Sequence, residues 1–263
     1  MLEYTHAIIL GIVEGLTEFL PVSSTGHLIL AEEALGFHSP IAKMFTIVIQ
    51  LGAILAICWL YRAKLWDVAT HIHQKPQQAF VFKLFVAFLP AAIIGLLFHK
   101  AIEAHLFSPV IVAVSLILGG IVIWVVEKKR PVAHVLSIDD ITLKQAFLIG
   151  CAQAVAIIPG TSRSGATIIG GLILKLDRKV ATEFSFFLAI PIMCAATLLD
   201  VIKNYGTLTS QDIGVIAVGF IVSFFAALGA VKFFIGFIGK HDFIPFAIYR
   251  IIFGSAMLAY YTL

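Results

Sequence analysis

Charged residues and cysteines are scarce in this sequence of 263 residues. Asp, Glu, Lys and Arg make up 13% of the chain, against about 25% in average globular proteins, so they are too few to cover a water-soluble surface. The formal net charge of +3 excludes a strongly basic surface for nucleic acid. The cysteines lie far apart in apolar stretches, which excludes a disulfide framework and predicts buried free thiols at Cys58, Cys151 and Cys194.

Hydrophobic residues, in contrast, make up 60% of the chain, and the mean hydropathy is +1.04. A helix needs about 20 apolar residues to cross the hydrocarbon core of a bilayer. Six stretches reach that length, at residues 41–61, 79–98, 107–126, 181–202, 213–238 and 244–263. The sequence therefore predicts an all-α integral membrane protein.

Two further apolar regions, 4–36 and 143–175, are each interrupted by a polar loop. The loops read PVSSTGH at 21–27 and PGTSRSG at 159–165. Each half of these regions is too short to span a membrane, and irregular backbone at membrane depth requires protein or a water-filled cavity around it. We therefore expect two re-entrant helical hairpins.

The order of one hairpin and three spans occurs twice, which predicts internal repeats at 1–131 and 140–263 within one membrane domain. Three spans per half place the second half in the membrane with the opposite orientation, so the fold class is an inverted-topology repeat. The residues that match are mainly polar rather than aliphatic. The aligned pairs are Gly11 with Gly150, Glu14 with Gln153, Ser23 with Ser162, Ser24 with Arg163, Thr25 with Ser164 and Gly26 with Gly165.

Basic residues are concentrated in the connections at 62–78, 127–146 and 175–180. The positive-inside rule places these connections in the cytoplasm. Both termini then lie outside, the first hairpin enters from the outer face, and the second enters from the inner face. The two polar loops should meet near the middle of the membrane, where inverted-repeat proteins place their sites.

Two carboxylates, Glu14 and Glu18, precede the first loop and lie four residues apart. On a helix they share one face, one turn apart. Because ionised groups are costly inside a membrane, such residues are candidates for a functional site. Their oxygens suit Mg²⁺ or Ca²⁺, so we predict a metal site that also holds phosphate. The alternative is that they bond to neighbouring helices or reach the interface.

The first loop offers hydroxyls, a glycine and an imidazole where a helix begins: Ser23, Ser24, Thr25, Gly26 and His27. A helix N-terminus binds anions through its free N–H groups, which predicts phosphate contacts here. These residues could equally cap the helix without any ligand. His27 follows Ser24 by three residues, and a hydroxyl beside an imidazole is the usual arrangement of an activated nucleophile.

The second loop carries Arg163 among the hydroxyls of Ser162, Ser164 and Thr167. A guanidinium binds phosphate through two parallel hydrogen bonds, so we predict that all four residues contact phosphate. The alternative is an ion pair between the arginine and one of the two glutamates. Taken together, the loops hold the components of a phosphoryl-transfer site.

Other polar residues in the apolar spans are expected to reach the interface or to bond between helices. Glu183 is left open, because it begins a span close to the second hairpin. The residues expected to reach the interface or to bond between helices are Gln50, Lys83, Asp200, Lys232 and Arg250.

The segments EGLTEFLPVSSTGH at 14–27 and PGTSRSGAT at 159–167 resemble the signature loops of the bacterial undecaprenyl-diphosphate phosphatase family, BacA/UppP. The likeness extends over essentially the whole chain, including EFSFFLAIP at 183–191 and FIPFAIYR at 243–250. The resemblance implies a bacterial inner-membrane enzyme that removes the terminal phosphate of undecaprenyl diphosphate. Such an enzyme recycles the lipid carrier for cell-wall synthesis and confers resistance to bacitracin, with a site accessible from the outer face.

The resemblance also implies roles for individual residues. Glu18, Ser24, His27 and Arg163 would be catalytic, and Glu14 would help Glu18 to hold a divalent cation. Ser24 or a water would attack the phosphate, with His27 transferring the proton. Whether a phosphoserine forms, and whether the cation binds to the protein or arrives with the diphosphate, stays open.

A polyprenyl diphosphate lipid and the membrane lipids are the expected partners, without nucleic acid. A homodimer is a reasonable expectation for such folds, although the sequence leaves the oligomeric state open. The competing interpretation is a secondary transporter or a lipid-phosphate flippase, because many transporters share the inverted-repeat plan. A nucleophile favours the enzyme, and release of phosphate would distinguish the two.

Overall fold

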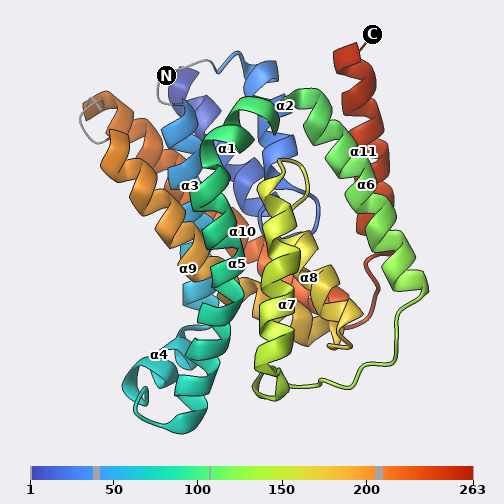
Figure 1. Cartoon of the computed structure of the whole chain (residues 1–263). Helices are drawn as coiled ribbons and strands as arrows, with labels where there is room; N and C mark the ends of the chain where they lie inside the picture. The colour runs from blue at the N-terminus through green and yellow to red at the C-terminus, as the bar shows by residue number, and fades with distance from the viewer. Residues whose placement is uncertain (1, 38–41, 107, 205–209, 263) are drawn as a thin grey trace.

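The structure is a computed structural model that describes residues 2–37, 42–106, 108–204 and 210–262. Two 3₁₀ turns lie at Ile138–Asp140 and Val155–Ile157, and Val135 and Leu176 form an isolated β-bridge. The remaining regular structure is α-helical (Figure 1). The helices are α1 (Leu2–Thr17), α2 (Ser24–Leu35), α3 (Ala42–Leu60), α4 (Arg62–Thr70), α5 (Lys75–Leu106), α6 (Pro109–Lys128), α7 (Leu143–Ala154), α8 (Arg163–Ile173), α9 (Arg178–Asn204), α10 (Ser210–Ile238) and α11 (Ile244–Thr262).

Five of the described helices are long and apolar enough to cross a membrane: α5, α6, α9, α10 and α11. A sixth span is formed if α3 and α4 are counted together, and these two helices are bent by 76° where the apolar run gives way to Arg62 and Lys64. The predicted all-α membrane fold is confirmed, and each predicted span overlaps a described helix. Residues 41, 107 and 263, at the ends of three predicted spans, lie outside the described residues. The helical conformation of α4 within the connection 62–78 was not predicted.

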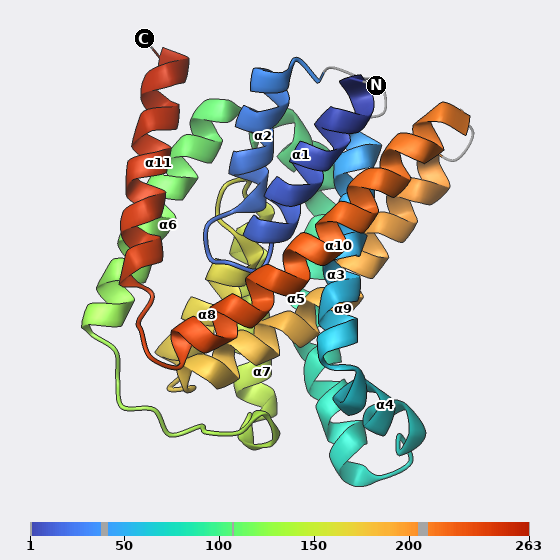
Figure 2. The same cartoon turned by 180° about the vertical axis from the view of Figure 1, so that it is seen from behind.

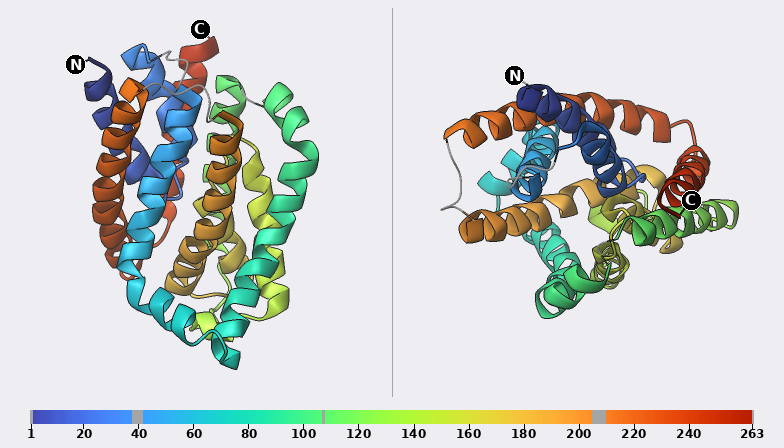
Figure 3. Two further views of the ribbon diagram at one scale, coloured as in Figure 1. Left: turned by 90° about the vertical axis from the view of Figure 1, so that its left-hand side faces the viewer. Right: turned by 90° about the horizontal axis from the view of Figure 1, so that it is seen from above.

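Two helical hairpins approach each other from opposite ends of the molecule (Figures 1 and 2). α1 packs against α2, and α7 packs against α8. The termini lie at the end from which α1 enters, whereas α4 and the basic connections lie at the other end (Figure 3). The loops of both hairpins lie between these ends. The proposed boundaries of the internal repeats remain a prediction.

Two glycines at aligned positions allow each hairpin to approach a long helix closely. A Cβ atom at Gly11 of α1 would lie 2.6 Å from the carbonyl oxygen of Gly219 in α10. A Cβ atom at Gly150 of α7 would lie 2.3 Å from the carbonyl oxygen of Ala87 in α5. Neither distance tolerates a side chain, so these helices pack backbone against backbone, as is common between membrane helices.

An ion pair joins three helices at the basic end of the molecule. Glu127, at the end of α6, accepts two hydrogen bonds from Arg178 at the start of α9, at 2.9 and 2.8 Å. The backbone N–H of Phe243, which precedes α11, donates to the same carboxylate at 3.1 Å. These contacts join the end of α6 to the start of α9 and to the segment before α11.

The prediction of buried thiols is wrong for two of the three cysteines. Cys151 and Cys194 are exposed, and Cys58 is partly buried. The physical reason is that lipid, rather than the protein interior, surrounds much of the apolar surface of a membrane protein. An apolar stretch therefore does not identify the buried face of its helix.

Candidate functional site

The two polar loops begin their second helices in the same unusual way. Ser23 has φ 69° and precedes α2, and Ser162 has φ 73° and precedes α8. Among the described non-glycine residues, only Lys175 also has a positive φ. Such conformations cost on the order of 1–3 kcal/mol each and persist only where surrounding contacts impose them. Aligned serines in both hairpins thus adopt a strained backbone at the loop tips.

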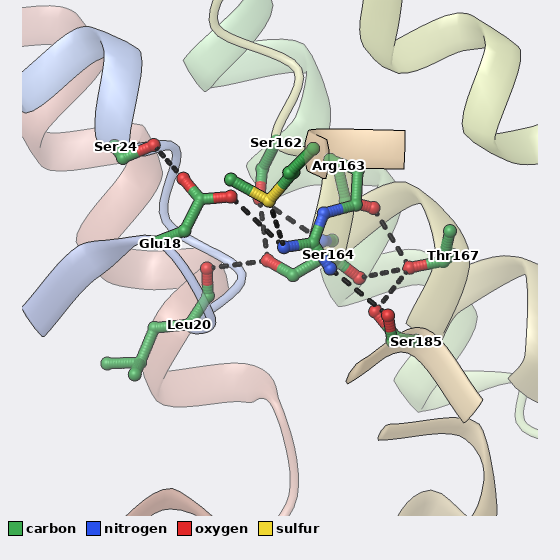
Figure 4. A network of polar contacts seen from close by, with 10 residues as sticks. Glu18, Leu20, Ser24, Ser162, Arg163, Ser164, Thr167 and Ser185 are labelled. Carbon is green, nitrogen blue, oxygen red and sulfur yellow. Dashed lines mark hydrogen bonds and ion pairs between the residues drawn. The ribbon is translucent and has the colours of Figure 1, made fainter. Parts of the chain in front are cut away.

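The loops meet through Glu18, which connects the first hairpin to the second (Figure 4). The hydroxyl of Ser24 donates to Oε2 of Glu18 at 2.5 Å, and Nη2 of Arg163 donates to Oε1 at 3.0 Å. The Glu18 side chain is 8% exposed and that of Arg163 is 13% exposed. One oxygen of the largely buried carboxylate therefore accepts a hydrogen bond from a hydroxyl, and the other accepts one from a guanidinium.

Arg163 has further contacts that fix its orientation. Nη1 donates to the carbonyl oxygen of Ser185 at 3.1 Å, Nη2 lies 3.6 Å from the sulfur of Met193, and the guanidinium lies 5.5 Å from the centre of the Phe19 ring. Its Nε is buried and has no hydrogen-bond partner among the described atoms. The ion pair weighed as an alternative at this position is present, and the described contacts leave part of the donor capacity of the guanidinium unused.

The hydroxyls of the second loop are mostly bonded to protein. Ser162 Oγ accepts from the N–H of Gly165 at 3.1 Å, and Ser164 Oγ donates to the carbonyl oxygen of Leu20 at 2.8 Å. Thr167 Oγ1 donates to Ser185 Oγ at 2.6 Å. These bonds cap α8 and join the loops to each other and to α9. The bonds to protein explain these hydroxyls, and no ligand is needed to satisfy them.

Arg250 of α11 was not predicted as part of the site, yet it holds both loops together. Its side chain is completely buried and donates to five backbone carbonyl groups. The acceptors are Leu116 (3.2 Å), Ser115 (3.2 Å), Pro21 (3.1 Å), Gly160 (3.0 Å) and Thr161 (3.0 Å). The only sequence signal was an arginine within an apolar span. Helix-to-helix bonding, which was expected, is present, but the loops are its main targets.

Glu14 and His27, the other two residues predicted to be catalytic or to bind metal, differ in their surroundings. Glu14 lies one turn before Glu18 with no exposed surface, and neither carboxylate oxygen has a partner among the described atoms. Nδ1 of His27 lies 2.8 Å from the carbonyl oxygen of Ser23, and Nε2 lies 2.6 Å from the hydroxyl of Tyr249. The described hydrogen bonds of His27 thus lead away from Ser24, whose partner is Glu18.

A cavity of about 590 Å³ opens beside the loops. Its polar lining residues are Glu18, Ser23, Ser24, Thr25, Gln50, Gln153, Ser162 and Arg163. Of the other predicted phosphate contacts, Gly26, Ser164 and Thr167 lie outside the described lining, as does Glu14. The opposite wall is apolar and comes from α5 and α9, with Phe88, Ala91, Gly95, Ile192, Ala195 and Leu199. The cavity therefore suits a ligand with an anionic head and an apolar tail.

A metal ion would need oxygens from the ligand in addition to those of the protein. No group of three or more His, Cys, Asp or Glu side chains that could hold an ion occurs in the described part of the chain. Mg²⁺ is often bound by one or two carboxylates together with substrate phosphates. Glu18 lines the cavity, and Glu14, whose buried carboxylate oxygens have no partner among the described atoms, precedes it by one helical turn. The two carboxylates would supply the protein part of such a donor set.

These features define a multi-pass membrane protein whose polar site is built from two opposed helical hairpins beside an amphiphilic cavity. Comparison with known proteins agrees with this class. The family model described as "Bacitracin resistance protein BacA" matches residues 7–256, and the chain belongs to that family.

Curated relatives cover nearly the whole chain. A protein of Methylobacillus flagellatus named undecaprenyl-diphosphatase is 56% identical over 260 residues, which is 97% of each chain. Proteins of the same name from Nitrosomonas europaea and Aromatoleum aromaticum are 54% and 53% identical. They cover 96% and 99% of this chain and 92% and 95% of their own lengths.

Proposed function

We propose that this protein hydrolyses undecaprenyl diphosphate to undecaprenyl phosphate and inorganic phosphate. The names of its relatives support this function, as does the family to which it belongs. The observation that carries the proposal is the hydroxyl of Ser24, bonded to Glu18 at 2.5 Å on the wall of an amphiphilic cavity that Arg163 also lines. The reaction returns the lipid carrier to cell-wall synthesis, and it confers bacitracin resistance by removing the drug's target.

The attacking group in this proposal is the Ser24 hydroxyl. Its oxygen forms a bond to the terminal phosphorus, and its proton passes to Glu18. The bond between that phosphorus and the bridging oxygen breaks, and undecaprenyl phosphate leaves with the bridging oxygen. A water then attacks the phosphoserine, which releases phosphate and restores the serine. In this proposal Glu18, rather than the predicted His27, accepts the proton, because Glu18 is the hydrogen-bond partner of Ser24.

Arg163, which lines the cavity and whose side chain is 13% exposed, would bind the transferring phosphate through N–H groups of its guanidinium. Negative charge builds up on the phosphate oxygens during transfer, so a fixed cation stabilises the transition state more than the ground state. The ion pair with Glu18 and the bond to Ser185 hold the guanidinium in place before the substrate arrives. The same ion pair joins Glu18, the proposed proton acceptor, to Arg163, the residue proposed to bind the phosphate.

A divalent cation would be held by Glu18 and Glu14 together with the diphosphate, as the donor set described above allows. Such an ion supplies positive charge that offsets the charge of the phosphate oxygens. Without the ion, Glu14 would lower the unfolding free energy, because the carboxylate of Glu14 is buried without a partner among the described atoms.

The prenyl tail would lie between α5 and α9. Where α3 packs on α10, a Cβ atom at Gly52 would lie 2.3 Å from the carbonyl oxygen of Phe220. A Cβ atom at Gly95 of α5, in contrast, would meet no atom within 4 Å, and Gly95 lines the cavity. The space beside this glycine gives an isoprenoid chain a route from the lipid to the polar loops.

We further propose that the protein lies in the bacterial plasma membrane with its cavity accessible from the outer face. The basic connections lie at the end opposite the termini, and the positive-inside rule assigns that end to the cytoplasm. The apolar wall of the cavity uses the later turns of α5 and α9, which run toward the end that holds the termini.

Purified protein in detergent provides the test of the proposed function. Wild-type protein is expected to release phosphate from undecaprenyl diphosphate, and Ser24→Ala is expected to lose that activity while it keeps its thermal stability. Ser255→Ala, a serine substitution in α11 outside the described cavity lining, is the matched control. A folded wild-type protein that releases no phosphate, as expected of a transporter, would contradict the proposal.

A further inference from the structure

The strained turn before Ser24 is held differently from its counterpart in the second loop. Ser162 has φ 73° and ψ 114°, and its own hydroxyl accepts a hydrogen bond from the N–H of Gly165 at 3.1 Å. Ser23 has φ 69° and ψ 98°, but its side chain makes no capping hydrogen bond. Another residue must therefore hold the backbone of Ser23.

His27 supplies that contact. Its Nδ1 lies 2.8 Å from the carbonyl oxygen of Ser23, and because a carbonyl only accepts, Nδ1 is the donor. In the neutral imidazole Nε2 is then the acceptor, so the hydroxyl of Tyr249, 2.6 Å away, donates to it. A chain of two hydrogen bonds thus runs from Tyr249 through His27 to the backbone of Ser23.

Stacked rings fix the imidazole in this position. The His27 ring is 4.3 Å from the Phe253 ring with an angle of 7° between the planes, and 5.6 Å from the Tyr249 ring with an angle of 6°. Tyr249 and Phe253 are themselves nearly parallel, at 5.7 Å. The imidazole cannot turn away from Ser23 without losing both its stacking and its bond to Tyr249.

Consecutive residues of α11 therefore hold the first loop at two points. Arg250 donates to the carbonyl oxygen of Pro21 at 3.1 Å, and Tyr249 acts on the carbonyl of Ser23 through His27. Pro21 and Ser23 lie on the short segment between the two helices of the hairpin. The direction of the next residue, the proposed nucleophile, follows from the conformation of that segment.

We propose that Tyr249 is a positioning residue for the phosphatase reaction. By orienting His27, it fixes the carbonyl of Ser23 and so keeps the hydroxyl of Ser24 directed at Glu18. This inference rests on the proposed function of the site. In this role His27 donates to the backbone and does not carry the proton of the nucleophile.

The substitution Tyr249→Phe tests the inference, because it keeps the stacked ring and removes only the hydroxyl. We expect kcat to fall about threefold to tenfold, the effect of losing one neutral hydrogen bond. KM and the thermal midpoint should stay near wild type, and the pH–rate profile should keep its shape. Tyr260→Phe is the matched control, since it removes a hydroxyl from an exposed tyrosine of the same helix, 3.4 Å from Glu33.

A double-mutant cycle separates positioning through His27 from a direct effect on the substrate. Tyr249→Phe should cost nothing further in a His27→Ala background, because the hydroxyl acts only through the imidazole. An equal loss in both backgrounds overturns the inference. A displaced pH–rate profile in Tyr249→Phe also overturns it, because that shift is expected if His27 carries the proton, and this comparison does not need the His27→Ala protein.

The outcome also distinguishes this inference from the proposed function. A wild-type protein that releases no phosphate overturns the function and the inference with it. An active wild type combined with an unchanged Tyr249→Phe overturns the inference alone.

Discussion

The arginine of the second loop is predicted to act through its planar guanidinium and not through charge alone. Arg163 bonds to Glu18 at 3.0 Å and to the carbonyl oxygen of Ser185 at 3.1 Å, and it lines the cavity in which the phosphate would bind. A lysine keeps the charge, but its ammonium group cannot reproduce three donors in one plane. Arg163→Lys should therefore lose most of the activity and keep most of the stability.

The magnitudes follow from the same contacts. Loss of one fixed donor to a developing negative charge costs roughly 10²-fold to 10³-fold in kcat, or about 3–4 kcal/mol, and this loss is expected for both Arg163→Lys and Arg163→Ala. Arg163→Ala also leaves Glu18 buried with Ser24 as its described partner. Breaking a buried pair in this way costs about 3–5 kcal/mol of unfolding free energy.

Steady-state phosphate release and thermal melts in detergent, made on both variants, provide the assay. The double variant Glu18→Gln/Arg163→Ala removes both charges, so it should recover stability relative to Arg163→Ala without recovering activity. A near-wild-type kcat in Arg163→Lys would refute the proposed binding of phosphate by the guanidinium. The only role left for Arg163 would then be its structural ion pair with Glu18.

Three further predictions concern residues outside the network of Glu18, Ser24 and Arg163. Arg250→Gln should lower the unfolding free energy by roughly 3–5 kcal/mol, because buried carbonyl groups lose a charged donor. A thermal melt equal to that of the wild type would contradict the role of Arg250 in holding the two loops together. Glu127→Gln should cost about 1–3 kcal/mol, since its partner Arg178 is partly exposed, and should leave kcat unchanged; reduced kcat in the folded protein would contradict this separation. Gly95→Leu should raise KM for the C55 substrate more than for a short-chain analogue, whereas Gly229→Leu, which also faces open space, should not; an equal effect of the two would place the tail elsewhere.

The fold was largely predictable because hydropathy reports directly on a membrane protein. The six apolar stretches became helices, and the polar breaks in the two remaining regions became the loops of the hairpins. The bend before α4 was missed, because a short amphiphilic helix at an interface and a loop have similar compositions. The cysteine prediction failed because a sequence does not distinguish a lipid-facing surface from a protein interior.

The site was predictable in its membership but not in its pairings. Glu18, Ser24 and Arg163 were identified from their residue types, and they form one network. The pairing of Ser24 with Glu18 depends on the positive φ of Ser23, which sequence spacing does not reveal. Arg250 was missed because its acceptors are backbone carbonyls, which have no signal in the sequence.

The hydroxyls of the second loop show why residue type alone overstates ligand contacts. Ser164 and Thr167 have the chemistry to bind phosphate, but both are buried and bonded to protein. Their donors are used to join the hairpins and α9. A capping or bridging hydroxyl and a ligand-binding hydroxyl are identical in sequence, and only their surroundings distinguish them.

The central claim is that the Ser24 hydroxyl attacks the terminal phosphate while Glu18 accepts its proton, and the stereochemical course at phosphorus tests it most directly. A substrate whose terminal phosphate is made chiral with sulfur and oxygen isotopes would be hydrolysed in isotopically labelled water. Transfer to Ser24 followed by transfer to water is two in-line displacements, so the account predicts retention of configuration. Inversion would mean that water attacks directly, and it would contradict the account.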